Sequence, residues 1–190
     1  MNKIFLIGGS AGSFQITGKI LSSLPSDYAY PVIFCLHRLR NVRSGIITTL
    51  EINSNIPVKE AYDKEKIISP MAYIAPSNYH LLFEDKNSFS LSLDPPQNHS
   101  RPSIDMSMMR AAEVFKENLI GIILSGANSD GAKGMKRILE MGGTTIVQDP
   151  KSCDIATMPQ ACLKLFKPNY IMDVDAIINF MVNFESQQNH

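Results

Sequence analysis

Three residues that together could hydrolyse an ester or amide each follow a short apolar run of the sequence. Ser10 lies in the glycine-rich turn of the opening stretch IFLIGGSAGS, His37 directly follows YPVIFCL, and Asp130 comes shortly after LIGIIL. A serine hydroxyl becomes a good nucleophile when an imidazole removes its proton and a carboxylate holds that imidazole in the required tautomer. We therefore predict that Ser10 is a nucleophile, His37 its base and Asp130 the orienting carboxylate.

Each of these residues also has an ordinary structural explanation when it is taken alone. Serine is common at helix N-termini, so Ser10 could cap a helix or contact a bound phosphate. His37 could be a partly buried polar residue at a strand end, and Asp130 could cap the helix that follows it. Three such residues at one expected crevice are better explained by one site than by three coincidences.

The three residues meet only if the apolar runs before them are neighbouring strands of one sheet. Residues 3–8, 30–36 and 119–124 are short and almost wholly apolar, which is typical of strands buried on both faces. Further strands are expected at 144–148 and 170–173, and helices at 13–23, 45–51, 104–116, 132–141, 158–166 and 175–184. This alternation predicts a doubly wound α/β fold, with a mostly parallel sheet covered by helices on both faces. Functional groups of such sheets gather at the carboxyl ends of the strands.

The middle of the chain departs from this alternation. The stretches AYIAPSNYHLLFED and SFSLSL contain two or three strands separated by turn signals. We predict an antiparallel hairpin that is inserted into the main sheet or lies at its edge. The prolines of DPPQNHSRPS make the next stretch a loop, and Ser103 and Asp105 are expected to cap the helix after it.

The composition is that of one globular domain, which we place at residues 1–184, followed by a polar tail at 185–190. The formal net charge is zero, which gives no reason to expect nucleic acid as a partner. No run approaches the ~18 apolar residues of a membrane span, and glycines end the first apolar run too early for a signal peptide. Three cysteines without a CxxC pair fit reduced thiols. These features predict a cytoplasmic protein without membrane insertion, and no spacing suggests a metal site.

The glycine-rich opening turn could instead bind a dinucleotide. That use requires the pattern G-x-G-x-x-G and an acidic residue about 20 positions later. Here the glycines are Gly8, Gly9 and Gly12, no acid ends the second strand, and no Walker lysine follows. Nucleotide binding is therefore disfavoured.

Several longer stretches carry a resemblance to a known family. They are IGGSAGS, the strand that ends at His37, YIAPSNYHLL, RPSIDMSM, GIILSGANSDGAKGM, GGTTIVQDPKSC and MPQA. In order and spacing, residues 4–172 resemble the catalytic domain of chemotaxis protein-glutamate methylesterases. The resemblance implies a serine hydrolase without a cofactor that demethylates glutamate methyl esters on chemoreceptor-type proteins, and that often deamidates glutamines as well. It implies the roles of nucleophile, base and orienting carboxylate for Ser10, His37 and Asp130.

The resemblance also implies how the oxyanion is stabilised and where this chain departs from the family. Backbone N–H groups near Ala11 and in the Ala127-Asn128 loop would bind the oxyanion. Threonine is common in the family where this chain has Ala11, and methionine where it has Ala127, which leaves the choice of substrate open. Members commonly carry an N-terminal receiver domain, whereas this chain opens with the first strand, so such control is expected either to come from a separate receiver protein or to be missing.

Three arginines and two histidines are further candidates for the surroundings of the site. Arg38, Arg40 and Arg43 follow the expected base, either as a solvated basic loop or as a rim that attracts acidic substrate helices. His80 is expected in a structural or supporting position, and His99 lies in a loop that could reach the crevice.

Two other function classes stay open at this point. The chain could be a serine hydrolase that acts on a different small ester or amide. It could also be a catalytically inactive interaction module with the same fold.

Overall fold

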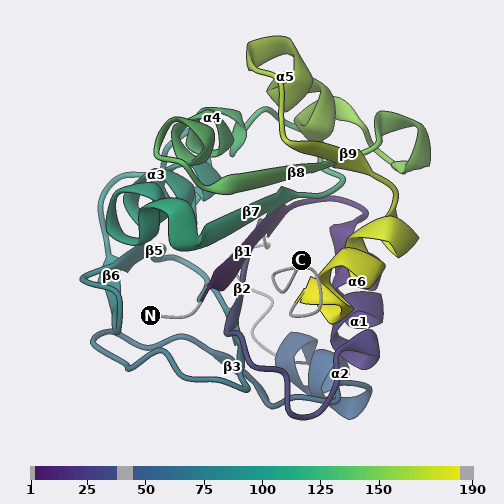
Figure 1. The fold of residues 1–190 in the computed structure, drawn as a ribbon. Helices are drawn as coiled ribbons and strands as arrows, with labels where there is room; N and C mark the ends of the chain where they lie inside the picture. The colour runs from purple at the N-terminus through teal and green to yellow at the C-terminus, as the bar shows by residue number, and fades with distance from the viewer. Residues whose placement is uncertain (1–2, 38–44, 185–190) are drawn as a thin grey trace.

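A parallel sheet forms the centre of the molecule. The computed structural model describes residues 3–37 and 45–184, and over these residues the main sheet has seven strands in the order β3-β4-β2-β1-β7-β8-β9 (Figure 1). All of its neighbouring strands are parallel. The strands are β1 (Ile4–Gly9), β2 (Val32–Leu36), β3 (Val58–Glu60), β4 (Ala72–Ile74), β7 (Leu119–Ile123), β8 (Thr144–Gln148) and β9 (Tyr170–Met172).

Helices cover both faces of this sheet, which confirms the predicted doubly wound α/β fold. The helices are α1 (Ser13–Ser23), α2 (Ile46–Ile52), α3 (Ile104–Phe115), α4 (Ala132–Glu140), α5 (Thr157–Leu165) and α6 (Val174–Val182), with short 3₁₀ turns at Lys116–Asn118 and Pro150–Ser152. In Figure 1, α3, α4 and α5 lie on one side of the sheet, and α1, α2 and α6 lie on the other.

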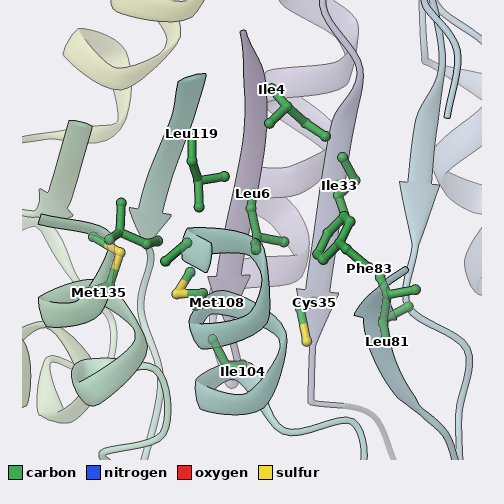
Figure 2. Packing of buried hydrophobic residues seen from close by; sticks show 14 of the residues in the cluster. Ile4, Leu6, Ile33, Cys35, Leu81, Phe83, Ile104, Met108, Leu119 and Met135 are labelled. Atoms are coloured by element: carbon green, nitrogen blue, oxygen red, sulfur yellow. The ribbon is translucent and has the colours of Figure 1, made fainter. Parts of the chain in front are cut away.

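The central strands are apolar throughout because both of their faces are buried. In β1, Ile4 and Leu6 pack into the cluster under α3 and α4, whereas Phe5 and Ile7 pack into the cluster under α1 and α6. Figure 2 shows the first of these clusters, with side chains of β1 and β2 on the same side as Met108 of α3. Two-sided burial removes the alternation of polar and apolar residues.

The inserted hairpin forms a sheet of its own. Strands β5 (His80–Phe83) and β6 (Phe89–Ser92) pair with each other in an antiparallel two-stranded sheet. This small sheet packs on α3, where the rings of Phe83 and Phe115 meet edge to face with centroids 5.1 Å apart. The Ser107 hydroxyl of α3 also donates to the Leu81 carbonyl at 2.6 Å. The predicted antiparallel hairpin is confirmed, but it covers a helix in a separate sheet and lies neither within the main sheet nor at its edge.

Strand β3 and the C-terminal tail are the remaining segments to compare with the predictions from sequence. Strand β3 was not predicted, because it has only three residues and two of them are charged. The expected polar tail at 185–190 lies outside the described residues. Among the residues with assigned structure, no helix is long and apolar enough to cross a membrane.

Candidate active site

The carboxyl ends of three adjacent strands bring the predicted residues to one edge of the sheet. Strand β1 lies between β2 and β7, and Ser10, His37 and Asp130 follow these three strands respectively. Backbone hydrogen bonds continue past the strand ends, since the His37 N–H donates to the Gly9 carbonyl at 3.1 Å and the Ser10 N–H donates to Ser125 at 3.0 Å. The loops that carry the three residues therefore start in register.

His37 and Asp130 are in direct contact. The Nε2 atom of His37 lies 2.8 Å from Oδ2 of Asp130, and the Asp130 side chain is fully buried. The same carboxylate accepts the N–H of Ile104 at 2.8 Å, the N–H of Asp105 at 3.0 Å and the hydroxyl of Ser103 at 3.1 Å. It is thus held at the start of α3 from several directions.

These contacts keep the carboxylate charged despite its burial. Burial alone raises the pKa of Asp130, but the hydrogen bonds from His37 and from the N–H groups of Asp105 and Ile104 outweigh it. The net pKa lies below the ordinary value of 3.8. Near neutral pH, Asp130 is therefore an acceptor only.

Asn128 settles which nitrogen of the imidazole carries the proton. Its Oδ1 accepts the Asp130 N–H at 3.0 Å, so its Nδ2 is the atom 3.2 Å from Nδ1 of His37. Because Asp130 accepts at Nε2 and Asn128 donates at Nδ1, the neutral ring has its hydrogen on Nε2 and its lone pair on Nδ1. Nδ1 is therefore the atom that can act as a base.

Ser10 shares a cavity with His37. The cavity has a volume of about 260 Å³, and its walls are Ser10, Ser13, Phe14, Leu36, His37 and Ile46. The apolar walls are Phe14 at the start of α1, Leu36 at the end of β2 and Ile46 at the start of α2. The half-buried Ser10 and the imidazole thus line one cavity, which also offers an apolar space for a substrate side chain.

The glycines before and after Ser10 are required by close packing and by the backbone. A Cβ atom at Gly9 would lie 2.6 Å from the Ser13 side chain, and one at Gly8 would lie 2.5 Å from Ile104. Gly12 has φ of +85°, in the left-handed region. The IGGSAGS stretch is therefore a tight strand-to-helix turn rather than a phosphate loop of the G-x-G-x-x-G type.

The other predicted site residues are Ala11, Ala127, Asn128 and three arginines. Ala11 and Ala127 are exposed beside the site, and Asn128 reaches it with its side chain. The predicted rim residues Arg38, Arg40 and Arg43 lie outside the described residues.

His80 supports the carboxylate through Ser103. The imidazole is fully buried, its Nδ1 accepts the Ser103 N–H at 3.1 Å, and its Nε2 lies 3.2 Å from the Pro95 carbonyl. Ser103 caps α3 as predicted, accepting the Met106 N–H at 3.3 Å, and its hydroxyl also donates to Asp130. His99 is exposed in the preceding loop.

Asp105 has a different role from the predicted cap of its own helix. Its Oδ1 accepts the N–H of Gly134 at 2.8 Å and so binds the first turn of α4. Burial raises the pKa of Asp105, and the neighbouring Asp130 charge adds to that increase. Across the described ranges 3–37 and 45–184, no cluster of His, Cys, Asp and Glu side chains could hold a metal ion.

Comparisons with known proteins point to one family. A family model described as CheB methylesterase matches residues 5–181. A putative protein-glutamate methylesterase/protein-glutamine glutaminase of Leptospira interrogans is 41% identical over 180 residues, covering 95% of this chain and 93% of the relative. A protein-glutamate methylesterase/protein-glutamine glutaminase of Thermotoga maritima is 31% identical over 173 residues, covering 90% of this chain. This chain spans 50% of that longer relative.

A solved structure has the same fold. The crystal structure of the Thermotoga maritima CheB methylesterase catalytic domain matches with a TM-score of 0.92 and 28% sequence identity. The match covers 97% of this chain and 99% of that domain.

Proposed function

The chain belongs to the CheB methylesterase family, and from this premise we propose that it hydrolyses glutamate methyl esters with Ser10 as nucleophile. The contact of His37 with the buried Asp130 is the observation that carries the proposal, because it leaves a lone pair on Nδ1 of the imidazole. The relatives' names add glutamine deamidation as a second activity of the same site.

In the first half of the proposed reaction, Oγ of Ser10 attacks the ester carbonyl carbon and its proton passes to Nδ1 of His37. The imidazolium keeps its Nε2–H on Asp130, whose charge stabilises it. Nδ1 then returns the proton to the departing methoxide, so that methanol leaves and an acyl group stays on Ser10. With a glutamine side chain, the leaving group is ammonia.

In the second half, His37 takes a proton from water, and the hydroxide attacks the acyl carbon. The C–O bond to Ser10 breaks, the serine recovers its proton from Nδ1, and the glutamate is released as a carboxylic acid that gives its proton to solvent. In the resting site, the amide of Asn128 donates to Nδ1. The Ser10 hydroxyl must share or replace that donor, which makes Asn128 part of the base's immediate surroundings.

The cavity beside Ser10 fits the proposed substrate class. Phe14, Leu36 and Ile46 provide an apolar wall, and the methyl ester of a glutamate side chain is neutral and largely aliphatic. The oxyanion donors that we propose are backbone N–H groups near Ala11 and in the Ala127-Asn128 loop. At both positions alanine can supply a backbone donor as well as a longer residue can.

The proposed partner is a methylated chemoreceptor-type protein, with regulation by a separate receiver protein. If they border the site, Arg38, Arg40 and Arg43 would attract acidic helices of that partner. A cytoplasmic location is part of the proposal and is supported by three free cysteines.

The test is methanol release from a methylated receptor fragment, run beside ammonia release from the glutamine form and hydrolysis of a small ester. The proposal predicts methanol release by the wild type and its loss in His37→Gln. Hydrolysis of the small ester alone would favour a different substrate. A folded protein that turns over none of the three would favour an interaction module.

A further inference from the structure

A buried serine at the end of β7 is bonded to the turn that carries Ser10. Ser125 is fully buried, and its N–H donates to Oε1 of Gln148 at 2.8 Å. Its carbonyl accepts the Ser10 N–H at 3.0 Å. Its hydroxyl oxygen lies 3.0 Å from the Ala11 carbonyl and also 3.0 Å from the Ile155 carbonyl.

The single proton of this hydroxyl is best used on Ala11. The Ile155 carbonyl already accepts the Gly126 N–H at 3.0 Å, and the Ile155 N–H donates to the Ser125 oxygen at 3.1 Å. Among the described residues, no other donor reaches the Ala11 carbonyl. Because the Ile155 carbonyl already has a donor, we assign the hydroxyl proton to the Ala11 carbonyl.

This bond sets the direction of the next backbone N–H. In a trans peptide, the Ala11 carbonyl and the Gly12 N–H point in opposite directions. Ser125 lies on the β7 side of β1, whereas His37 and the substrate cavity lie on the β2 side. The Gly12 N–H therefore points away from the Ser125 hydroxyl.

Little else fixes this peptide. The preceding carbonyl, that of Ser10, is held by the N–H of Ser13 at 3.0 Å and by its hydroxyl at 2.6 Å. Gly12 itself can rotate more freely than any other residue, so the Ala11–Gly12 peptide can turn over at small steric cost. An oxyanion donor is effective only when its direction is fixed before the reaction.

We propose that Ser125 is a positioning residue of the hydrolytic reaction, whose hydroxyl holds the Gly12 N–H toward the oxyanion that forms at Ser10. This inference rests on the proposed function. It adds Gly12 to the oxyanion donors and gives a buried residue outside the cavity an effect on kcat.

The first test compares two variants that each delete one buried hydroxyl. Ser125→Ala removes the bond to Ala11 and the acceptor of the Ile155 N–H, and it keeps the backbone bonds of residue 125. Thr145→Val is the matched control. Thr145 lies in β8 and is also fully buried, and its hydroxyl donates to Oδ1 of Asn169 at 2.8 Å. In methanol release, Ser125→Ala is expected to lower kcat about tenfold or more with little change in KM. Thr145→Val is expected to keep the wild-type kcat.

Ser10→Ala in the same assay separates the inference from the proposed function. If Ser10→Ala keeps wild-type activity, the proposed function itself fails. If Ser10→Ala is inactive while Ser125→Ala keeps wild-type kcat, or loses no more than Thr145→Val, the inference alone is overturned.

A second variant removes the proposed donor directly. A synthetic segment ending at residue 34, joined by native ligation to a chain that begins at Cys35, can carry glycolic acid in place of Gly12. The ester oxygen then replaces the N–H. If Ser125 acts through that N–H, the single change lowers kcat as Ser125→Ala does, and the double variant loses no more than either. The inference is overturned if the losses in kcat of the two single variants multiply in the double variant. It is also overturned if the ester variant keeps the wild-type kcat.

Discussion

The imidazole of His37 donates its Nε2–H to the buried carboxylate of Asp130 over 2.8 Å. The bond joins the loop after β2 to the loop after β7, across the strand that carries Ser10. It fixes the tautomer of the ring and places the reactive lone pair on Nδ1. The proposed chemistry depends on that assignment more than on any other contact in the molecule.

Asp130→Asn is expected to lower kcat by roughly 10³-fold or more. An amide has only one acceptor oxygen, so it cannot replace both carboxylate oxygens, which accept from His37 and Ile104 and from Asp105. Its NH₂ group must face either the Ile104 N–H or the Asp105 N–H. The free energy of unfolding is therefore expected to fall by about 1–3 kcal/mol as well. Steady-state methanol release and urea unfolding measure the two effects.

The control for this variant is Asp173→Asn, at the exposed N-cap of α6. Asparagine caps a helix as well as aspartate does, so both activity and stability should be retained. An Asp130→Asn enzyme with wild-type kcat would contradict the role of the carboxylate.

The two buried aspartates predict opposite contributions to stability as the pH falls. Asp130 has a lowered pKa, so its stabilisation is present above the unfolded-state value near 3.9 and is lost as the pH falls through its lower folded pKa. Asp105 has a raised pKa, so its ionisation is a cost near pH 7 that disappears as the pH falls through that raised value. The contribution of these two groups to the free energy of unfolding should therefore rise from pH 7 toward pH 4 and fall below it.

Asp105→Asn isolates the second contribution. The amide oxygen can still accept the Gly134 N–H, while the charge beside Asp130 is removed. The variant should be at least as stable as the wild type at pH 7, and its stability should rise less between pH 7 and pH 4. Urea unfolding at several pH values measures this, and a clear loss of stability at pH 7 would contradict the prediction.

Two glycines near the start of α1 should respond oppositely to alanine. At Gly12 a Cβ atom would lie 2.8 Å from Oγ of Ser125, and φ is +85°, so Gly12→Ala is expected to cost about 1–2 kcal/mol and most of the activity. At Gly18, inside the helix, a Cβ atom meets nothing within 4 Å, so Gly18→Ala is expected to stabilise by up to about 1 kcal/mol. Equal effects of the two changes on unfolding would argue against the turn geometry.

The thiols should be slow to react in the native protein. Burial raises the pKa of Cys35 and Cys162 to about 12, and that of the half-buried Cys153 to about 11. Very little thiolate is then present at pH 8. A thiol-reactive dye should modify the folded chain slowly and three groups per chain after unfolding. Fast modification of one native thiol that persists in Cys153→Ser would contradict the buried placement of the other two.

Much of this arrangement follows from local sequence. Two-sided burial makes the central strands uniformly apolar, and a strand-ending glycine or histidine marks the edge where Ser10 and His37 lie. Once the strands are parallel, topology alone brings the three predicted residues to one edge.

The contacts around these residues could not be found in the same way. Ser103 has the pattern of a helix cap and fulfils it, yet its hydroxyl also binds Asp130, 27 positions away. Asp105 has the same pattern but binds the start of another helix. Asn128 was expected to contribute its backbone, whereas its side chain contacts His37. Each of these depends on loops packed against each other from distant parts of the chain, for which the sequence has no periodic signal.

The proposed nucleophile is tested most directly by methanol release from a methylated receptor fragment, with Ser10→Ala compared with Ser22→Ala. Ser22 is an exposed serine of α1, the helix that follows Ser10, with its hydroxyl bonded only locally to Lys19. We predict that Ser10→Ala loses at least about 10³-fold in kcat while it stays folded, and that Ser22→Ala equals the wild type. A folded Ser10→Ala protein that releases methanol at the wild-type rate would contradict the account.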